Sequence, residues 1–468
     1  MHEGPQDSEK KSHAELSERL VDADLWFDIL RKTLLVGLVT VTVWVGCSLM
    51  RWSVEFGTER LFYSAEEYGA TTPLLGAGVI LVVLLVAGVV RALLLLRPAW
   101  RDSEGDGIDK ALVRIHDTYE GDGEDPSGRY AEPTFGYAVR KMIMTTLTIG
   151  SGGSGGLEAP GVYVGETVAA GWSKVFKRPS AEELRLYQLV GIAAAIGALL
   201  EAPFTAALFA AELVYAGRII YRTLAYCLVA GVFAYELNHH LLGLGSLFES
   251  PKHSMTFIWQ EYLLVVIVAV GFSAPAAIAL GPVFRGAARV FDKLPLVARA
   301  VAGALFTGVV AIAMWVFLDV HPKHILGIGE ETINDVVNGT GPEVLRIWWI
   351  LLLAVVAKTL ATAATLKSGG SVGMLIPAMY MGALVGGAGY YLLGDLGLYA
   401  GPSVTVFAAS GMAAALTAVA GVPLASIALV LEVFGPDYGP AAAISCAMCF
   451  TASRRFSLYL RPSATHDE

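Results

Sequence analysis

Residues 141–165 read KMIMTTLTIGSGGSGGLEAPGVYVG, and residues 358–382 read KTLATAATLKSGGSVGMLIPAMYMG. The two stretches align without a gap at an offset of 217 residues (358 minus 141). They share a Lys, two Thr, the run Ser-Gly-Gly-Ser, a Gly, a Pro, a Tyr and a final Gly. A match of this length within one chain indicates an internal repeat.

A second pair of stretches supports the repeat. Residues 191–214 read GIAAAIGALLEAPFTAALFAAELV, and residues 411–434 read GMAAALTAVAGVPLASIALVLEVF, at an offset of 220 (411 minus 191). Each contains a proline that is followed nine residues later by a glutamate. Both pairs occur in the same order at nearly the same offset, so chance is a poor explanation for them.

Each Ser-Gly-Gly-Ser run leads into a proline and then into a helix-like stretch. Glycine frees the backbone and proline suits the first turn of a helix, so each repeat predicts an extended loop that enters a helix N-terminus. Within a bilayer such a loop must be buried in protein or line a cavity, and the helix start favours an anion. The alternative is a pair of glycine-rich packing helices. Lys141 and Lys358, which open the two stretches, either raise the positive potential around a pore or snorkel to the membrane surface.

The composition is that of a membrane protein. The 468 residues are 55% hydrophobic and only 16% charged, with a mean hydropathy of +0.59, whereas soluble chains carry about 25% charged residues. Continuous apolar stretches of roughly 18 residues predict membrane-spanning helices, because barrel strands give weaker, alternating segments. We predict an all-α polytopic membrane protein of two inverted repeats of tilted and broken helices, with a pore at their interface. The candidate spans are residues 34–49, 74–96, 189–215, 219–235, 262–280, 298–317, 347–364 and 404–431.

Lysine and arginine near the spans predict the orientation of the chain. Basic residues gather before the first span, after the second, in residues 285–293 and near the C-terminus, and we place all of them, with both termini, in the cytoplasm. The expected external loops are residues 53–72, 243–257 and 321–342. The expected divisions are a cytoplasmic N-terminal arm (1–30), a first repeat half (31–285), a second repeat half (286–460) and a short cytoplasmic tail (461–468).

Three loops of the chain resemble those of the CLC family of chloride channels and proton-coupled chloride exchangers, whose loop backbone faces the anion. The family's middle loop, G-(K/R)-E-G-P, is matched by Gly156-Leu157-Glu158-Ala159-Pro160. The third, G-x-F-x-P, is matched by Gly373-Met374-Leu375-Ile376-Pro377. The first, G-S-G-I-P, has a degraded match in Gly105-Asp106-Gly107-Ile108-Asp109. The resemblance extends from about residue 34 to residue 459, and it rests on order, spacing and the repeat together.

The resemblance implies a set of anion-binding residues, which also includes a pore tyrosine near the C-terminus. This set is Asp106, Gly156, Leu157, Met374, Leu375, Ile376 and Tyr459. Asp106 departs from the family, whose serine donates a hydrogen bond to the anion, because an ionised aspartate cannot donate and repels chloride. Three interpretations of Asp106 are open. The side chain is protonated, it is turned away from the anion as the N-cap of a helix, or it indicates a different ion selectivity. The alternative for Tyr459 is an interfacial residue of the aromatic belt.

Glu158 is the candidate gate. An ionisable residue within a membrane protein's spans is costly and therefore a functional candidate. At a helix start its carboxylate can occupy an anion site and leave it when protonated. The resemblance implies that Glu158 is the gating glutamate and part of a proton path. Its repeat counterpart is Leu375, so the repeat itself requires no carboxylate there. The alternative is a helix-capping carboxylate without a role in transport.

Glu212 and Glu432 occupy equivalent positions in the two halves, and this symmetry favours a structural role for both. In exchangers of the family, a glutamate that relays protons commonly follows the residue matched by Glu212, and here Leu213 takes that place. The departure favours a passive anion channel gated by protonation of Glu158. The alternatives are an anion/proton antiporter with another proton route, and a transporter of a different ion, which Asp106 keeps open.

Other classes of protein fit the sequence less well. The net charge of −9 argues against nucleic acid as a partner. An intramembrane protease needs a Ser–His or Asp–Asp pair at membrane depth, which the spans do not offer, so we expect no enzyme. The four cysteines lie in apolar stretches without a completing histidine, so we expect no metal and no cofactor. The expected partners are chloride or a similar anion, protons in the antiporter alternative, the lipid bilayer and, by resemblance, a second copy in a homodimer.

Overall fold

The described part of the chain consists of helices and the segments between them, with one isolated β-bridge where two loops cross. Residues 1–22 of the predicted N-terminal arm and the whole predicted tail, 461–468, lie outside this part. The computed structural model describes residues 23–71, 73–117, 134–176, 180–215, 219–243, 247–248, 259–399, 401, 403–453 and 458–459.

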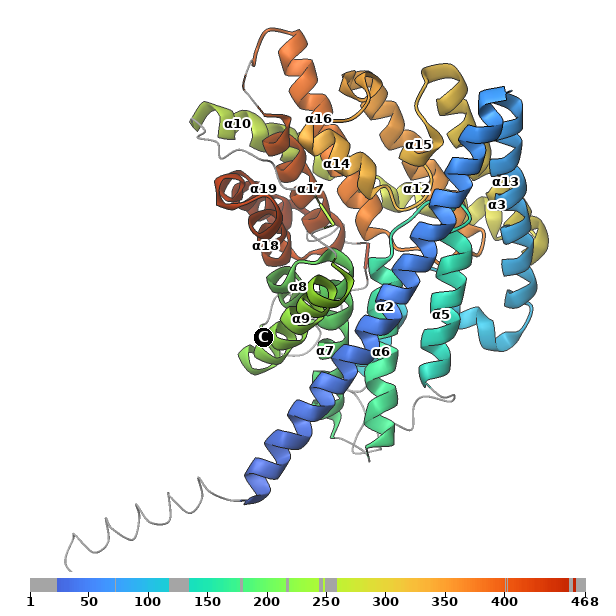
Figure 1. Ribbon diagram of the computed structural model, residues 1–468. Helices are drawn as coiled ribbons and strands as arrows, with labels where there is room; N and C mark the ends of the chain where they lie inside the picture. The colour runs from blue at the N-terminus through green and yellow to red at the C-terminus, as the bar shows by residue number, and fades with distance from the viewer. Residues whose placement is uncertain are drawn as a thin grey trace, which may run out of the picture.

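The helices fall into two sets of similar order, and Figure 1 shows α2 crossing the view while α3 and α13 lie side by side. The first set is α2 (Ala23–Thr71), α3 (Pro73–Leu95), η1 (Pro98–Ser103), α4 (Ile108–Asp117), α5 (Thr134–Ile149), α6 (Glu158–Val175), α7 (Ala181–Leu200), α8 (Pro203–Tyr215), α9 (Tyr221–Leu237) and η3 (Asn238–Leu242). The second set is α10 (Trp259–Val268), η4 (Ala269–Ser273), α11 (Ala274–Ile278), α12 (Leu280–Phe291), α13 (Leu296–Leu318), η5 (Pro322–His324), α14 (Glu330–Asn338), η6 (Glu343–Arg346), α15 (Trp348–Lys367), α16 (Leu375–Asp395), α17 (Val404–Ala420), α18 (Pro423–Val433), η7 (Pro436–Tyr438) and α19 (Gly439–Ser453).

The two sets correspond helix by helix along the chain. Helices α3 to α9 correspond in order to α13 to α19, and the long α2 corresponds to the run α10–α12, which the π-helical η4 interrupts. We therefore propose that the two halves join between α9 and α10. The boundary predicted at 285/286 falls inside α12. The basic cluster at 285–293 suggests a loop between the halves, but most of it belongs to the end of this helix.

Seven helices of the described part are long and apolar enough to cross a membrane. The predicted spans 74–96, 298–317 and 347–364 agree closely with α3, α13 and α15. The predicted spans 189–215 and 404–431 each break into two helices, α7–α8 and α17–α18. At each break, the residue that follows the first helix has a left-handed conformation, and a proline opens the second helix. The residues are Glu201 and Pro203 in the first half, and Gly421 and Pro423 in the second.

The segments 53–72 and 321–342, predicted as external loops, consist largely of helices, and their placement on the outer side stays a prediction. Helix α2 continues through nearly all of the first segment, and the second contains α14. Charged side chains lower the hydropathy at this end of α2, but Arg51 and Glu55 pair across one helical turn at 2.7 Å and support the helix. The third predicted loop, 243–257, lies almost entirely outside the described residues.

Reciprocal hydrogen bonds join the two halves. The hydroxyl of Thr145 lies 2.8 Å from that of Ser371, and the hydroxyl of Ser154 lies 3.0 Å from that of Thr362. The offset of 217 residues turns one pair into the other, since Thr145 corresponds to Thr362 and Ser154 to Ser371. Contacts that repeat with the partners exchanged are the mark of a two-fold axis, which here lies between the two Ser-Gly-Gly-Ser runs.

Glycines bring the central helices of each half into backbone contact. A Cβ added at Gly165 on α6 would lie 2.2 Å from the carbonyl oxygen of Gly191 on α7. At the equivalent crossing, a Cβ at Gly382 on α16 would lie 2.2 Å from the carbonyl oxygen of Gly411 on α17. Small residues allow this close approach of helices.

The four cysteines of the chain are free and buried.

Glu212 and Glu432 cap each other's helices across the same axis. Near the end of α8, Glu212 accepts hydrogen bonds from two amides at the start of α18, at 3.0 and 2.8 Å. Near the end of α18, Glu432 accepts from two amides at the start of α8, both at 2.7 Å, and from the hydroxyl of Thr205. Carboxylates are favourable at helix N-termini because the first amides have no partner within the helix. This geometry agrees with the structural role that their symmetry predicts.

Candidate functional site

Two glycine loops cross at the centre of the fold. The amide of Gly156 donates to the carbonyl of Gly373 at 2.9 Å, and the amide of Gly373 donates to the carbonyl of Gly156 at 2.8 Å. Beyond the crossing, one loop enters α6 at Glu158 and the other enters α16 at Leu375. The predicted extended loops that run into helix N-termini are therefore present. Figure 1 shows α6 and α16 on opposite sides of the middle of the molecule.

The crossing is buried, and the starts of both helices contribute to it. Leu157 and Met374 directly precede the two helices, and Leu375 and Ile376 form the first residues of α16, all of them buried. Amides in the first turn of a helix have no acceptor within the helix, so they can donate to an anion. The amide of Gly156 is already used in the pairing with the other loop.

Glu158 lies at this crossing with its side chain 2% exposed. Its Oε2 atom is buried and has no hydrogen-bond partner among the described residues. A Cβ added at Gly156 would lie 2.5 Å from this oxygen, so the position requires glycine. A buried carboxylate oxygen without a partner is costly, and the cost favours protonation or movement of the group.

Arg51 and Glu330 are charged groups that act on the electrostatic potential at Glu158. Arg51 lies on α2 and forms ion pairs with Glu55 and Glu201, both at 2.7 Å, and Glu330 opens α14. No motif in the sequence marks these residues as part of the site. The charged end of α2 suggests a loop, and the fold brings Arg51 and Glu330 into the electrostatic surroundings of Glu158.

Asp106 joins the crossing from a third loop. Its Oδ2 atom accepts hydrogen bonds from the amide of Met374 at 3.0 Å and from the hydroxyl of Tyr459 at 3.1 Å. Its Oδ1 atom accepts from the amide of Ile108 at 3.1 Å, as in an Asx turn. The structure thus brings together Asp106, Met374 and Tyr459 from distant parts of the sequence. One oxygen caps the start of α4, as predicted for an N-cap, but the other faces the crossing.

A cavity of about 790 Å³ opens toward Asp106 and Met374. It lies beside α12 and its basic cluster, the side that the sequence places in the cytoplasm. Five basic and four acidic side chains line it, so the balance of charge favours the entry of anions. These charged residues are Arg101, Lys110, Arg285, Arg299 and Lys367, with Glu104, Asp106, Asp109 and Asp292.

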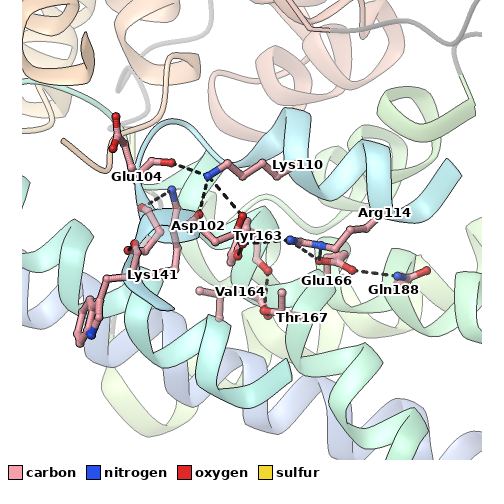
Figure 2. A network of polar contacts seen from close by, with 12 residues as sticks. Asp102, Glu104, Lys110, Arg114, Lys141, Tyr163, Val164, Glu166, Thr167 and Gln188 are labelled. Carbon is pink, nitrogen blue, oxygen red and sulfur yellow. Dashed lines mark hydrogen bonds and ion pairs between the residues drawn. The ribbon is translucent and has the colours of Figure 1, made fainter. Parts of the chain in front are cut away.

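A network of polar contacts holds the loop that carries Asp106, and Figure 2 shows its members. The buried amine of Lys141 donates to the carbonyl of Gly105 at 2.6 Å. The guanidinium of Arg114 lies 3.3 Å from Asp102 and 2.9 Å from the buried Glu166. The hydroxyl of Tyr163 also donates to Asp102. These contacts tie the loop to α5, α4 and α6, and they leave little freedom to its backbone.

The same arrangement recurs in the second half of the chain. Lys358 is buried and donates to the carbonyl of Gly327 at 2.9 Å, as Lys141 does to Gly105. Both lysines therefore face the interior, which excludes snorkelling to the membrane surface. Gly105 and Gly327 are related by an offset of 222 residues (327 minus 105), so they form a third repeat pair. The sequence signal for it is only a Gly-x-Gly in each loop.

Comparison with known proteins agrees with this geometry. Residues 69–454 match the sequence profile of the family described as voltage gated chloride channel. The chain belongs to the voltage gated chloride channel (CLC) family. It is therefore a multi-pass integral membrane protein whose activity is anion transport, and the prediction that it is not an enzyme is confirmed by its family.

Individual CLC proteins resemble the chain over most of its length. A protein from Ralstonia nicotianae named as a ClcB-like chloride channel protein is 28% identical over 302 residues, which cover 62% of this chain and 66% of that protein. A chloride/fluoride channel protein from Pseudomonas syringae pv. tomato is 27% identical over 339 residues, 70% of this chain and 69% of that protein. The structure of a slow cyanobacterial Cl⁻/H⁺ antiporter superposes with a TM-score of 0.75 at 18% identity, over 91% of this chain and 94% of that one.

The CLC fold confirms the predicted architecture of an all-helical, multi-span membrane protein. The roles of the individual site residues, the homodimer and the cytoplasmic placement of the termini stay predictions.

Proposed function

We propose that this chain conducts chloride or a similar small anion along a path through the crossing of the two glycine loops, and that protonation of Glu158 gates the path. The observation that supports this most strongly is the crossing itself. Two helix N-termini meet there in a buried place, and a cavity whose charged lining has a small excess of basic side chains leads to it. Helix N-termini favour negative charge, and burial strengthens the attraction.

A passive channel is the preferred form of this function. Leu213 stands where the family's exchangers commonly have a proton-relaying glutamate, and it is a buried apolar residue on α8. It can carry no proton. Proteins similar to this chain include one named as a chloride/fluoride channel and one described as a Cl⁻/H⁺ antiporter, so similarity alone does not choose between the two forms.

An anion/proton antiporter is the second candidate, because Asp106 supplies a titratable carboxyl at the end of the cavity. A cation transporter is disfavoured at this place. The groups that face the carboxylate of Asp106 are two amides and one hydroxyl that donate hydrogen bonds, whereas hard cations need several oxygen ligands.

The test is a reconstitution in liposomes loaded with chloride, in which chloride efflux and proton movement are recorded together, with and without a valinomycin shunt. A channel gives chloride efflux without uphill proton movement, and an antiporter drives protons uphill. The flux should rise as the pH falls, because the charged form of Glu158 occupies the path and the protonated form leaves it. The variant Glu158→Gln should carry more flux than the wild type at neutral pH, because its side chain stays neutral. Silence of the wild type toward every small anion would contradict the proposal.

A further inference from the structure

The carboxylate of Asp106 takes the hydrogen bonds that an anion at the crossing would take. Its Oδ2 atom occupies both the amide of Met374 and the hydroxyl of Tyr459, at 3.0 and 3.1 Å. These two groups are among the donors predicted to bind the transported anion. Each donor has a single hydrogen to give, so neither can serve Asp106 and an anion fully at the same time.

Charge adds to this competition. Asp106 is buried, with 7% of its surface exposed, and charges interact more strongly away from water. An ionised Asp106 therefore repels an anion that approaches Met374 from the cavity. Protonation removes the charge and the need for strong donors, and a rotation of the side chain toward the cavity frees the two donors.

The backbone around Asp106 is held in place, so the side chain is the part that can move. The carbonyl of Gly105 accepts from Lys141 at 2.6 Å, and the amide of Gly105 donates to the carbonyl of Gly370 at 3.0 Å. The cavity adjoins the carboxylate and offers space for it. The loop thus presents the carboxylate on a rigid support, next to an open volume.

The repeat shows that the fold does not need a carboxylate here. By the offset that relates Gly105 to Gly327, Asp106 corresponds to Ile328, which is buried in the equivalent loop of the second half. An apolar side chain therefore satisfies the same backbone geometry. The carboxylate is specific to the half whose loop faces Met374 and Tyr459.

We propose that Asp106 is a tethered competitor of the transported anion, which occupies the inner end of the anion site and must be protonated or displaced before an anion binds there. The proposal rests on the function proposed above and assigns to Asp106 a control of anion affinity from the side of the cavity. Glu158 and Asp106 then act as two carboxylate gates in series on one path.

Several charged and titratable groups face Asp106 and set the strength of this competition. Asp109 adds negative charge from α4, and Lys141 adds positive charge from α5. Tyr459 lies in the field of both Asp106 and Glu158. The remaining charged groups around the cavity are Arg101, Glu104, Lys110, Arg285, Asp292, Arg299 and Lys367.

The test measures chloride binding to the purified, detergent-solubilised full chain by isothermal titration calorimetry over a range of pH. All proteins carry Glu158→Gln, so that Glu158 contributes no pH dependence. The parent is compared with Asp106→Asn and Asp106→Ser. Asp109→Asn is the matched control, because it removes one negative charge from the adjacent first turn of α4 without removing a hydrogen bond of Asp106. Chloride efflux from liposomes is recorded for the same four proteins.

The parent should bind chloride more tightly as the pH falls. At neutral pH, the Asp106→Asn and Asp106→Ser proteins should bind chloride about tenfold more tightly than the parent, or tighter still. Their affinity for chloride should be nearly independent of pH. Asp109→Asn should keep the pH dependence of the parent. If the Asp106→Asn protein does not fold, the chloride affinity of the Asp106→Ser protein tests the proposal.

Two negative results are distinguishable. Chloride efflux with equal affinity and equal pH dependence in the parent and both Asp106 variants would overturn the role of Asp106 and leave the proposed function intact. The other result is that none of the four proteins binds or releases chloride and that the wild type shows no efflux. This result would overturn the proposed function and this inference with it.

Discussion

Glu158 and Asp106 differ in what holds them at the crossing of the loops. Asp106 has hydrogen-bond donors for both of its oxygens, whereas one oxygen of Glu158 has no partner in the described part of the chain. A carboxylate with three donors is held more firmly than one with an unsatisfied oxygen. We therefore expect Glu158 to leave the path more readily, and the inner end of the site to limit the flux.

Tyr459 provides a test at the scale of one hydroxyl. In the Asp106→Asn protein, Tyr459→Phe removes a donor to the anion and should weaken chloride binding by roughly tenfold, since a hydrogen bond to a charged group contributes about 1.5 kcal/mol or more. Calorimetric titration with chloride measures the change. Tyr459 is 4% exposed and donates to Asp106, so it is not an interfacial residue of the aromatic belt. Unchanged affinity would mean that its hydroxyl does not contact the anion.

At the scale of elements, local signals in the sequence predicted the site better than hydropathy predicted the helices. Glycine and proline act locally, so the loops that enter α6 and α16 could be located from the motifs. Hydropathy is continuous across the breaks between α7 and α8 and between α17 and α18, so it marks each pair of helices as one candidate span. The bonds of Asp106 join residues that are 268 and 353 positions apart. Such contacts follow from tertiary packing and cannot be deduced from a motif.

The reciprocal caps predict equal effects in the two halves. Glu212→Ala and Glu432→Ala each leave two amides of a helix N-terminus without their carboxylate, and each should lower the stability by about 2 kcal/mol. Thermal unfolding in detergent, followed by size-exclusion chromatography, measures both. Glu236→Ala is the control, because that side chain is exposed on α9. A large loss of chloride flux at normal stability would instead give these residues a functional role.

The glycine crossings predict a sharp difference between sites. Gly165→Ala and Gly382→Ala place a methyl group 2.2 Å from a backbone oxygen of the neighbouring helix, so each should strongly reduce the yield of folded protein. Gly78→Ala on α3 should be harmless, since nothing lies within 4 Å of the added atom. The yield of monodisperse protein after purification is the readout. Equal yields for all three variants would show that the two helix pairs pack less closely than described.

At the scale of the whole molecule, the repeat determines the architecture. Its two strongest stretches revealed the two-fold relation directly from the sequence, because they carry the residues that meet at the axis. The junction between the halves was harder to place, since α2 and the run α10–α12 share little sequence and differ in shape. Family membership shows anion transport in a membrane, and the orientation of the chain remains to be tested.

Orientation can be tested with single cysteines. Lys293 and Thr340 are exposed and lie beyond opposite ends of α13. With Lys293 on the cytoplasmic side, as the basic residues predict, Lys293→Cys should react with a membrane-impermeant maleimide only in inside-out vesicles, and Thr340→Cys only in right-side-out cells. The four native cysteines are buried, so the background should be low. The reverse pattern would place the cavity on the outer side.

The most direct test of the account is to locate a bound anion. Crystals of the Asp106→Ser protein grown with bromide would show the ion by its anomalous scattering. We expect a bromide peak within hydrogen-bond distance of the Met374 amide and the Tyr459 hydroxyl, where the wild type has the Asp106 carboxylate. Bromide bound elsewhere in the membrane domain, with this place empty, would contradict the claim that anions pass through the crossing of the two loops.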